Sequence, residues 1–338
     1  MKKLLPRLGK SVAVVGMAKN TGKTVTLNFL VHLAVEEGKT IALTSTGLDG
    51  EVFDSVSSLP KPAISLPTGA WLATAQESLK QGTARLEVAR ATGIYNPLGE
   101  VVIARVQRAG TVEVSGPERA SDLAWVIEEL AALSDLVLVD GALDRRAASA
   151  PGITESCILA TGAVVAPSVQ GVVKATAHQV GLLQLPPWPG SRDALVSALT
   201  AAPAALVSQE GRTEAIPLIT ILDGPRELLQ YLKPHWALVI RGAFTEELAG
   251  LLRGVKLPGG LDIIVADGSK VFVGQDSWQT LRSRGTRMWS AQTIHLAGIT
   301  VNPVSPRGRQ LPGGEIVRDL QGLFPNLAIF DPLASGGM

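Results

Sequence analysis

Residues 11–24 read SVAVVGMAKNTGKT and carry the clearest structural signal in the chain. Four of the first five residues are Val or Ala, a composition typical of a strand buried in a parallel sheet. A short loop between two glycines follows and ends in Gly-Lys-Thr. After it, Leu27, Leu30, Val31 and Ala34 recur at helical spacing. Strand, glycine loop and helix in this order predict an α/β fold with a mainly parallel sheet flanked by helices.

The loop from Gly16 to Thr24 has the residue types of a P-loop, the phosphate-binding loop of many nucleotide-hydrolysing proteins. Backbone N–H groups of such a loop converge on phosphate oxygens, and the dipole of the following helix favours the anion. Gly22 lets the backbone approach closely, the Lys23 ammonium can reach the terminal phosphates, and the Thr24 hydroxyl can bind Mg²⁺. We therefore expect the nucleotide to be bound by Gly16, Lys19, Asn20, Thr21, Gly22, Lys23 and Thr24.

The spacing of this loop is unusual. Five residues separate Gly16 from Gly22, where the usual pattern has four, and Lys19 adds a second cation inside the loop. The alternative interpretation is a glycine turn before a surface helix, with two solvated lysines. The strand expected before the loop and the helix expected after it favour the phosphate site.

Two carboxylates follow two further strands of the expected sheet. Residues 40–44 read as a strand that leads into a loop containing Asp49, and residues 136–139 are an apolar run that delivers Asp140. Ligands of open α/β sheets bind at the carboxyl ends of the strands. We expect Thr24, Asp49 and Asp140 to hold Mg²⁺ and Lys23 and Asp140 to act in catalysis, with Asp140 in the Walker-B position. Asp49 has the alternative of a solvated carboxylate in an Asp-Gly turn.

The spacing of Gly16 and the Gly22-Lys23-Thr24 ending resembles dethiobiotin synthetase and related proteins of the SIMIBI class of P-loop NTPases. Proteins of that type have a strand that ends in Asn, often followed by Pro, and the Asn contacts the nucleotide base. The resemblance therefore implies that Asn302, followed by Pro303, binds the base through its amide. The alternative is an Asn-Pro turn with a purely local role. It does not supply a diamino-acid substrate site that matches this chain residue by residue.

A second resemblance rests on segments spread along the chain. The chain is similar to P-loop proteins that accompany adenosylcobalamin-dependent lysine or ornithine aminomutases and are thought to reactivate them. The similarity lies in residues 17–20, 93–99, 140–146 and 160–163. This resemblance implies a client enzyme as partner and nucleotide hydrolysis that serves aminomutase reactivation.

Composition limits the other function classes. The chain has 338 residues, of which 46% are hydrophobic and 18% charged, enough to bury a sizeable core. Its 31 basic and 30 acidic residues remove a global electrostatic case for nucleic acid or an anionic membrane. The single cysteine, Cys157, excludes an intramolecular disulfide and reads as a small buried hydrophobe. No apolar run is long enough for a membrane helix, so we expect a cytoplasmic protein.

The rest of the chain predicts further α/β structure. Residues 101–106 and 112–114 predict a hairpin, and the proline-rich stretch at 186–190 predicts a boundary between a nucleotide-binding domain, 1–185, and a second α/β region, 186–338. Expected strands at 298–303 and 327–332 either complete the nucleotide site or belong to the second region.

Taken together, the residues and resemblances favour a nucleotide-binding, Mg²⁺-dependent protein that is a slow ATPase and an accessory or reactivating factor for a client enzyme. A small-molecule enzyme that activates a carboxylate with ATP is the first alternative, and a degenerate P-loop scaffold is the second. The choice between ATP and GTP stays open, as does a homodimer.

Overall fold

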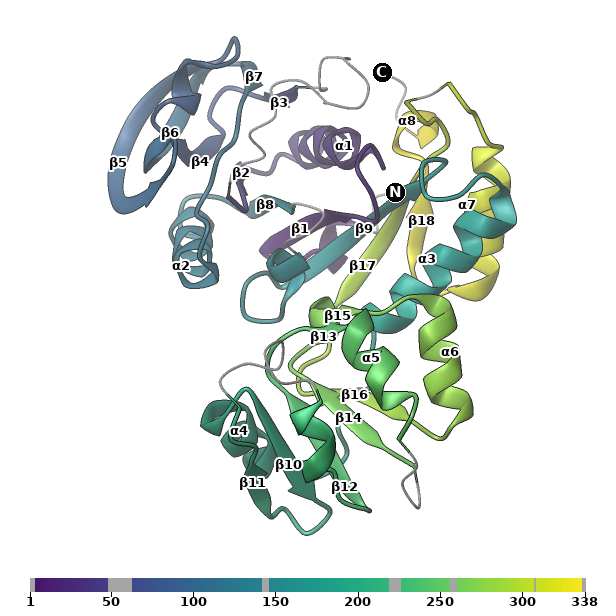
Figure 1. Ribbon diagram of the computed structural model, residues 1–338. Helices are drawn as coiled ribbons and strands as arrows, with labels where there is room; N and C mark the ends of the chain where they lie inside the picture. The colour runs from purple at the N-terminus through teal and green to yellow at the C-terminus, as the bar shows by residue number, and fades with distance from the viewer. Residues whose placement is uncertain are drawn as a thin grey trace. The chain divides into compact units, whose positions relative to one another are not determined.

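A computed structural model describes residues 4–47, 63–141, 146–218, 226–255, 260–306 and 308–335 (Figure 1). The chain divides into two compact units. The first comprises Met1–Ala177 together with His295–Met338, and the second is His178–Ile294, inserted between those two parts. The expected boundary at 185/186 therefore needs correction. The chain leaves the first unit close to that point, but it returns at His295, because the C-terminal strands pair with the first sheet and not with the second.

The elements of the first unit begin with the expected strand, loop and helix. Its strands are β1 (Ser11–Gly16), β2 (Ile41–Ser45), β3 (Ile64–Leu66), β4 (Trp71–Ala75), β5 (Arg85–Asn96), β6 (Gly99–Arg108), β7 (Gly110–Val112), β8 (Leu136–Gly141), β9 (Ser156–Gly162), β17 (Leu296–Asn302) and β18 (Ala328–Phe330). Its helices are α1 (Lys23–Glu36), α2 (Ala120–Ala131), α7 (Gly313–Leu323) and α8 (Pro332–Ser335), while α3 (Val169–Leu183) continues into the second unit.

Nine of these strands form one sheet in the order β18-β17-β9-β1-β8-β2-β4-β6-β5. The neighbours from β18 to β4 run parallel, and β6 and β5 add an antiparallel hairpin at one edge. Helix α1 packs on β1, β2 and β8, and α7 packs on β17 and β18. The expected α/β fold with a mainly parallel sheet flanked by helices is confirmed.

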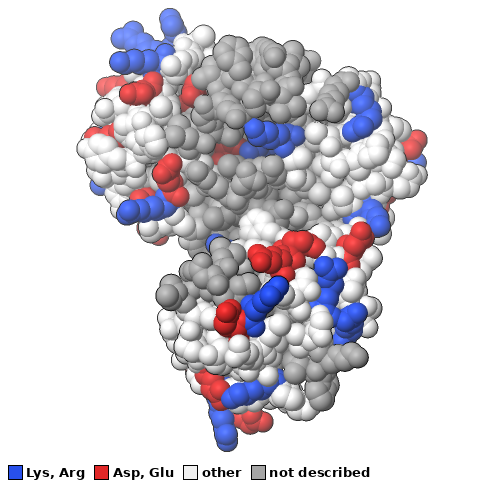
Figure 2. All heavy atoms as spheres, viewed as in Figure 1, with Lys and Arg blue, Asp and Glu red and all other residues white. Residues whose placement is uncertain are grey.

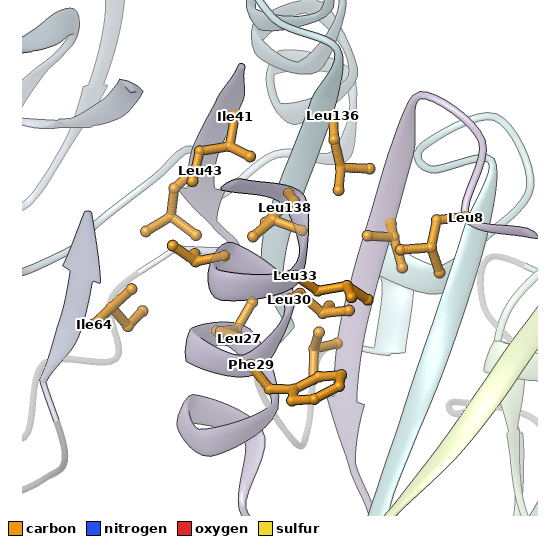
Figure 3. Packing of buried hydrophobic residues seen from close by; sticks show 14 of the residues in the cluster. Leu8, Leu27, Phe29, Leu30, Leu33, Ile41, Leu43, Ile64, Leu136 and Leu138 are labelled. Carbon is orange, nitrogen blue, oxygen red and sulfur yellow. The ribbon is translucent and has the colours of Figure 1, made fainter. Parts of the chain in front are cut away.

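Burial explains why β1 reads as an uninterrupted apolar run. All six of its residues are buried, as expected for a central parallel strand that is covered on both faces. Helix α1 covers one of those faces with Leu27, Leu30 and Leu33, which point into a cluster with Leu43 of β2 and Leu138 of β8 (Figure 3). This packing anchors the first helical turn at the carboxyl edge of the sheet.

The hairpin expected over 101–106 and 112–114 is wrong. Strand β6 pairs instead with β4 and β5, and β7 pairs with β3 in a separate two-stranded sheet. The turn of the real hairpin lies between Asn96 and Gly99, and the Asn96 side chain donates to the carbonyl oxygens of Ser115 and Gly116. Pairing partners from outside the local sequence override the local turn signal.

The second unit has its own sheet, in the order β11-β10-β12-β14-β16. Its strands are β10 (Ala204–Ser208), β11 (Thr213–Ala215), β12 (Trp236–Ile240), β14 (Asp262–Val265) and β16 (Arg287–Ser290), with β13 (Phe244–Thr245) and β15 (Val271–Phe272) as a separate pair. Its helices are α4 (Arg192–Ala201), α5 (Glu246–Leu252) and α6 (Gln275–Ser283). It also has hydrophobic clusters of its own, centred on residues such as Phe244, Leu238 and Ile263. The sequence predicts a second α/β region after the proline-rich stretch, and these strands and helices form one.

Two observations concern the distribution of charge on the surface and the search for membrane-spanning helices. On the face seen in Figure 2, basic and acidic side chains of the described residues are scattered among one another. Within the part of the chain that the structure describes, no helix has the length and apolar character needed to cross a membrane.

The thiol of Cys157 should be unreactive in the folded protein. Cys157 lies in β9 with no exposed surface, and burial raises the pKa of its thiol to about 12. Because the thiolate is the reactive form, we expect no labelling by a thiol reagent at pH 8 until the protein is unfolded in denaturant. Labelling followed by mass spectrometry checks this, and rapid modification of the native protein would contradict the buried position of β9.

Candidate functional site

The carboxyl ends of parallel strands meet at one edge of the first sheet. In the pairing register, Gly16 at the end of β1 lies beside Ala160 of β9, and Val14 lies beside Asp140 of β8. Strand β17 follows on the other side of β9. The loop between β1 and α1 therefore starts at the edge where ligands of open α/β sheets bind.

The loop is shaped by contacts that only small or left-handed residues permit. The Thr21 hydroxyl donates to the Ala18 carbonyl oxygen at 3.0 Å. Asn20 and Gly22 both have positive φ, 64° and 89°, so both adopt the left-handed conformation just before the helix starts. A Cβ on Gly16 would lie 2.6 Å from the Thr21 hydroxyl, which leaves no room for a side chain at that position.

Gly16→Ala should therefore disrupt the loop more than the fold. The added methyl group meets the buried Thr21 hydroxyl, so Thr21 must move and the loop must open. We expect a loss of about 1–3 kcal/mol in the free energy of unfolding, the usual cost of overpacking, and faster amide exchange in residues 17–23. Urea unfolding and hydrogen exchange measure these two effects.

Gly181→Ala is the matched control for that substitution. Gly181 lies in α3 and has no atom within 4 Å of where its Cβ would be, so Ala should be tolerated or slightly stabilising. Equal stability of Gly16→Ala and the wild type would contradict the loop geometry.

Lys23 and Asp140, the residues expected to act in catalysis, are brought together. Lys23 begins α1, and its ammonium donates to the Gly141 carbonyl oxygen at 2.8 Å. The same nitrogen lies 3.7 Å from Asp140 Oδ1, and the two side chains are only 15% and 14% exposed. An ion pair that is this shielded keeps more of its Coulomb attraction than a surface pair. One cation, at the start of α1, and one carboxylate, at the end of β8, therefore lie next to each other where the loop ends.

Asn302 reaches the loop from the far end of the chain. Its Nδ2 donates to the Asn20 carbonyl oxygen at 3.1 Å, and its Oδ1 accepts from the Val304 backbone N–H at 3.1 Å. The position of a Cβ on Gly22 would be 3.1 Å from Asn302 Cβ, so the side chain packs on both left-handed residues of the loop. Of the two alternatives for the strand at 298–303, the structure shows that β17 belongs to the first unit and ends beside the loop.

A small, open pocket lies beside the loop. The loop and α1 contribute Thr21, Gly22, Val25 and Thr26, β17 contributes Thr300, Val301 and Asn302, and the segment after β18 contributes Asp331, Pro332 and Leu333. Sequence reasoning did not single out the last three as site residues. The signal that could have found them is the same as for Asn302, a polar residue followed by Pro at the end of a short apolar strand.

The other two expected metal ligands are Thr24 and Asp49. Thr24 lies on the first turn of α1 and is half-buried. Asp49 lies outside the described residues, so its place relative to Asp140 is not described. Among the residues that the structure covers, no cluster of three or more His, Cys, Asp or Glu side chains could hold a metal ion by itself. A hydroxyl and a carboxylate at the loop are nevertheless the hard oxygen donors that Mg²⁺ accepts when phosphate and water complete its shell.

No family model matches the chain, and no curated protein or solved structure is significantly similar to it.

Proposed function

We propose that the first unit binds a nucleoside triphosphate together with Mg²⁺ and hydrolyses it slowly. The observation that carries this proposal is the placement of Lys23 next to Asp140, directly after a loop in which Asn20 and Gly22 are left-handed. A buried lysine beside a carboxylate could also be a purely structural ion pair. Its position at the carboxyl edge of a parallel sheet and at the N-terminus of a helix of 14 residues favours a binding role.

Each part of the loop has a distinct task in this proposal. Backbone N–H groups of the loop and of the first turn of α1 hold phosphate oxygens, as the partial positive charge of the helix terminus favours. Lys23 leaves the Gly141 carbonyl and neutralises the terminal phosphates, while Thr24 and Asp140 hold Mg²⁺, Asp140 through water. When bound, the metal would neutralise charge on the phosphates while the terminal phosphoryl group is transferred to water.

In this proposal the nucleobase lies over the small pocket beside the loop. Val25 and Leu333 offer apolar surface to a flat ring, and Asp331 offers a carboxylate beside it. The proposal covers ATP and GTP alike, since either purine has a face to stack and edge groups to pair.

The proposed role of this hydrolysis is accessory. It changes how tightly the protein binds a client enzyme in the cytoplasm. The second unit supports this role, because it has its own sheet and core and could contact a client while the first unit binds nucleotide. The resemblance described above makes an adenosylcobalamin-dependent aminomutase the client to test first.

The experiment is titration calorimetry with ATP and GTP, with and without Mg²⁺, followed by hydrolysis assays with and without the aminomutase. We expect Mg²⁺-dependent binding, slow basal hydrolysis and stimulation by the client. Stimulation by a small carboxylic acid instead would favour the metabolic-enzyme alternative. Absence of nucleotide binding would contradict the proposal as a whole.

A further inference from the structure

Two polar contacts tie the loop and the start of α1 to β17. The first is the hydrogen bond from Asn302 Nδ2 to the Asn20 carbonyl oxygen. The second joins the hydroxyls of Thr26 and Thr300 at 2.8 Å, where both side chains are buried. Thr26 also donates to the Gly22 carbonyl oxygen at 3.0 Å. Strand β17 thus contacts the start of α1 and the loop from 274 and 282 residues away in sequence.

We propose that Asn302 is a positioning residue that holds the 16–24 loop in its anion-binding shape. This inference rests on the proposed function for its consequence in binding, but the clamp itself is a property of the ligand-free protein. Asn302 acts through Asn20, the only described residue other than Gly and His235 with positive φ. Because a left-handed conformation is costly for a residue with a Cβ, an external contact at its carbonyl helps to maintain it.

The amide of Asn302 is oriented by its own contacts. Nδ2 faces a carbonyl oxygen and Oδ1 faces the N–H of Val304, so the reversed amide would place like atoms against each other at both ends. One hydrogen of Nδ2 and one lone pair of Oδ1 are left by these two bonds. Contact with a nucleobase is therefore an alternative role for the same side chain, and it predicts a different pattern of ligand specificity.

The first test measures hydrogen exchange in the ligand-free protein. Asn302→Ala should increase exchange in residues 17–23, because the Asn20 carbonyl loses its donor. Asn302→Asp keeps an acceptor for Val304 but sets a carboxylate against the Asn20 carbonyl, so it should increase exchange at least as much. Unchanged exchange of the loop in both variants would overturn the clamp, whether or not the protein binds nucleotide.

Asn28→Ala is the matched control. The Asn28 amide also makes two bonds, donating to the Ala63 carbonyl oxygen and accepting from the Ser65 N–H, both at 3.0 Å. Asn28 lies on α1, the helix that follows the loop, but its side chain anchors β3 and not the loop. We expect local exchange to rise around β3 in this variant and not in residues 17–23. An equal rise in the loop would show a general loosening of α1 and overturn the specific role of Asn302.

The second test compares a ligand with a base to one without. Asn302→Ala should weaken binding of Mg·ATP and of Mg·tripolyphosphate by the same factor, about fivefold, the scale of one lost hydrogen bond. Weaker ATP binding with unchanged tripolyphosphate binding would overturn the clamp in favour of base contact. If the wild type binds neither ligand, the proposed function fails, while the exchange experiment still decides the clamp.

Discussion

Lys23→Ala should weaken Mg·ATP binding by about 10- to 100-fold and reduce hydrolysis by on the order of 10²- to 10³-fold. The first figure is the scale of a lost charge-assisted hydrogen bond, and the second is that of a lost electrostatic contact in the transition state. Lys23 is the cation that the structure places behind the loop, 2.8 Å from the Gly141 carbonyl oxygen and within reach of Asp140. Calorimetry and a phosphate-release assay measure the two effects.

Lys39→Ala provides the control for the loss of a positive charge. Lys39 is exposed just beyond the other end of α1, so its removal should leave nucleotide affinity and turnover unchanged. Thermal unfolding of both variants separates a binding defect from a folding defect. Unchanged nucleotide affinity in a well-folded Lys23→Ala protein would favour the degenerate scaffold over the proposed hydrolase.

Asp140→Asn should reduce hydrolysis by on the order of 10²-fold while nucleotide binding is largely retained. The substitution keeps the shape of the side chain and removes one negative charge at the end of β8. Mg²⁺ would then lack the carboxylate that holds its water shell, and Lys23 would lose its nearby counter-charge at 3.7 Å. Hydrolysis measured across a Mg²⁺ titration should show a lower maximal rate and a weaker apparent affinity for Mg²⁺.

Asp135→Asn is the corresponding control at the opposite end of the same strand. Asp135 immediately precedes β8, and its Oδ2 accepts from the Thr40 backbone N–H at 2.8 Å. We expect a small loss of stability and normal hydrolysis, because this carboxylate lies at the amino edge of the sheet. Equal hydrolysis in Asp140→Asn and the wild type would remove Asp140 from the catalytic site.

The sequence predicts those parts of the site whose signals are local. The apolar run of β1, the glycine loop and the stripe of α1 are contiguous, and Asp140 follows an apolar strand in the same way. Their register in the sheet follows from the rule that parallel strands place their carboxyl ends together. The structure adds the proximity of Lys23 to Asp140, which spacing in the sequence cannot give.

The parts that could not be predicted depend on distant pairing. Strand β5 mixes charged, apolar and polar residues and has no clear alternation, and it forms a strand because β6 pairs along it. Strand β7 looks like the second arm of a hairpin but pairs with β3. The contact of Asn302 with Asn20 spans 282 residues, and an insertion with its own core lies in between. Tertiary context decides each of these three cases.

The position of β17 between β9 and β18 has a consequence for biosynthesis. The ribosome delivers the loop early, whereas β17 emerges only after the whole of the inserted second unit. Until then β9, whose seven residues are all buried in the finished sheet, presents an unpaired apolar edge. Such edges recruit other chains, so a nascent or truncated product that ends before His295 is expected to need chaperone protection and to aggregate without it.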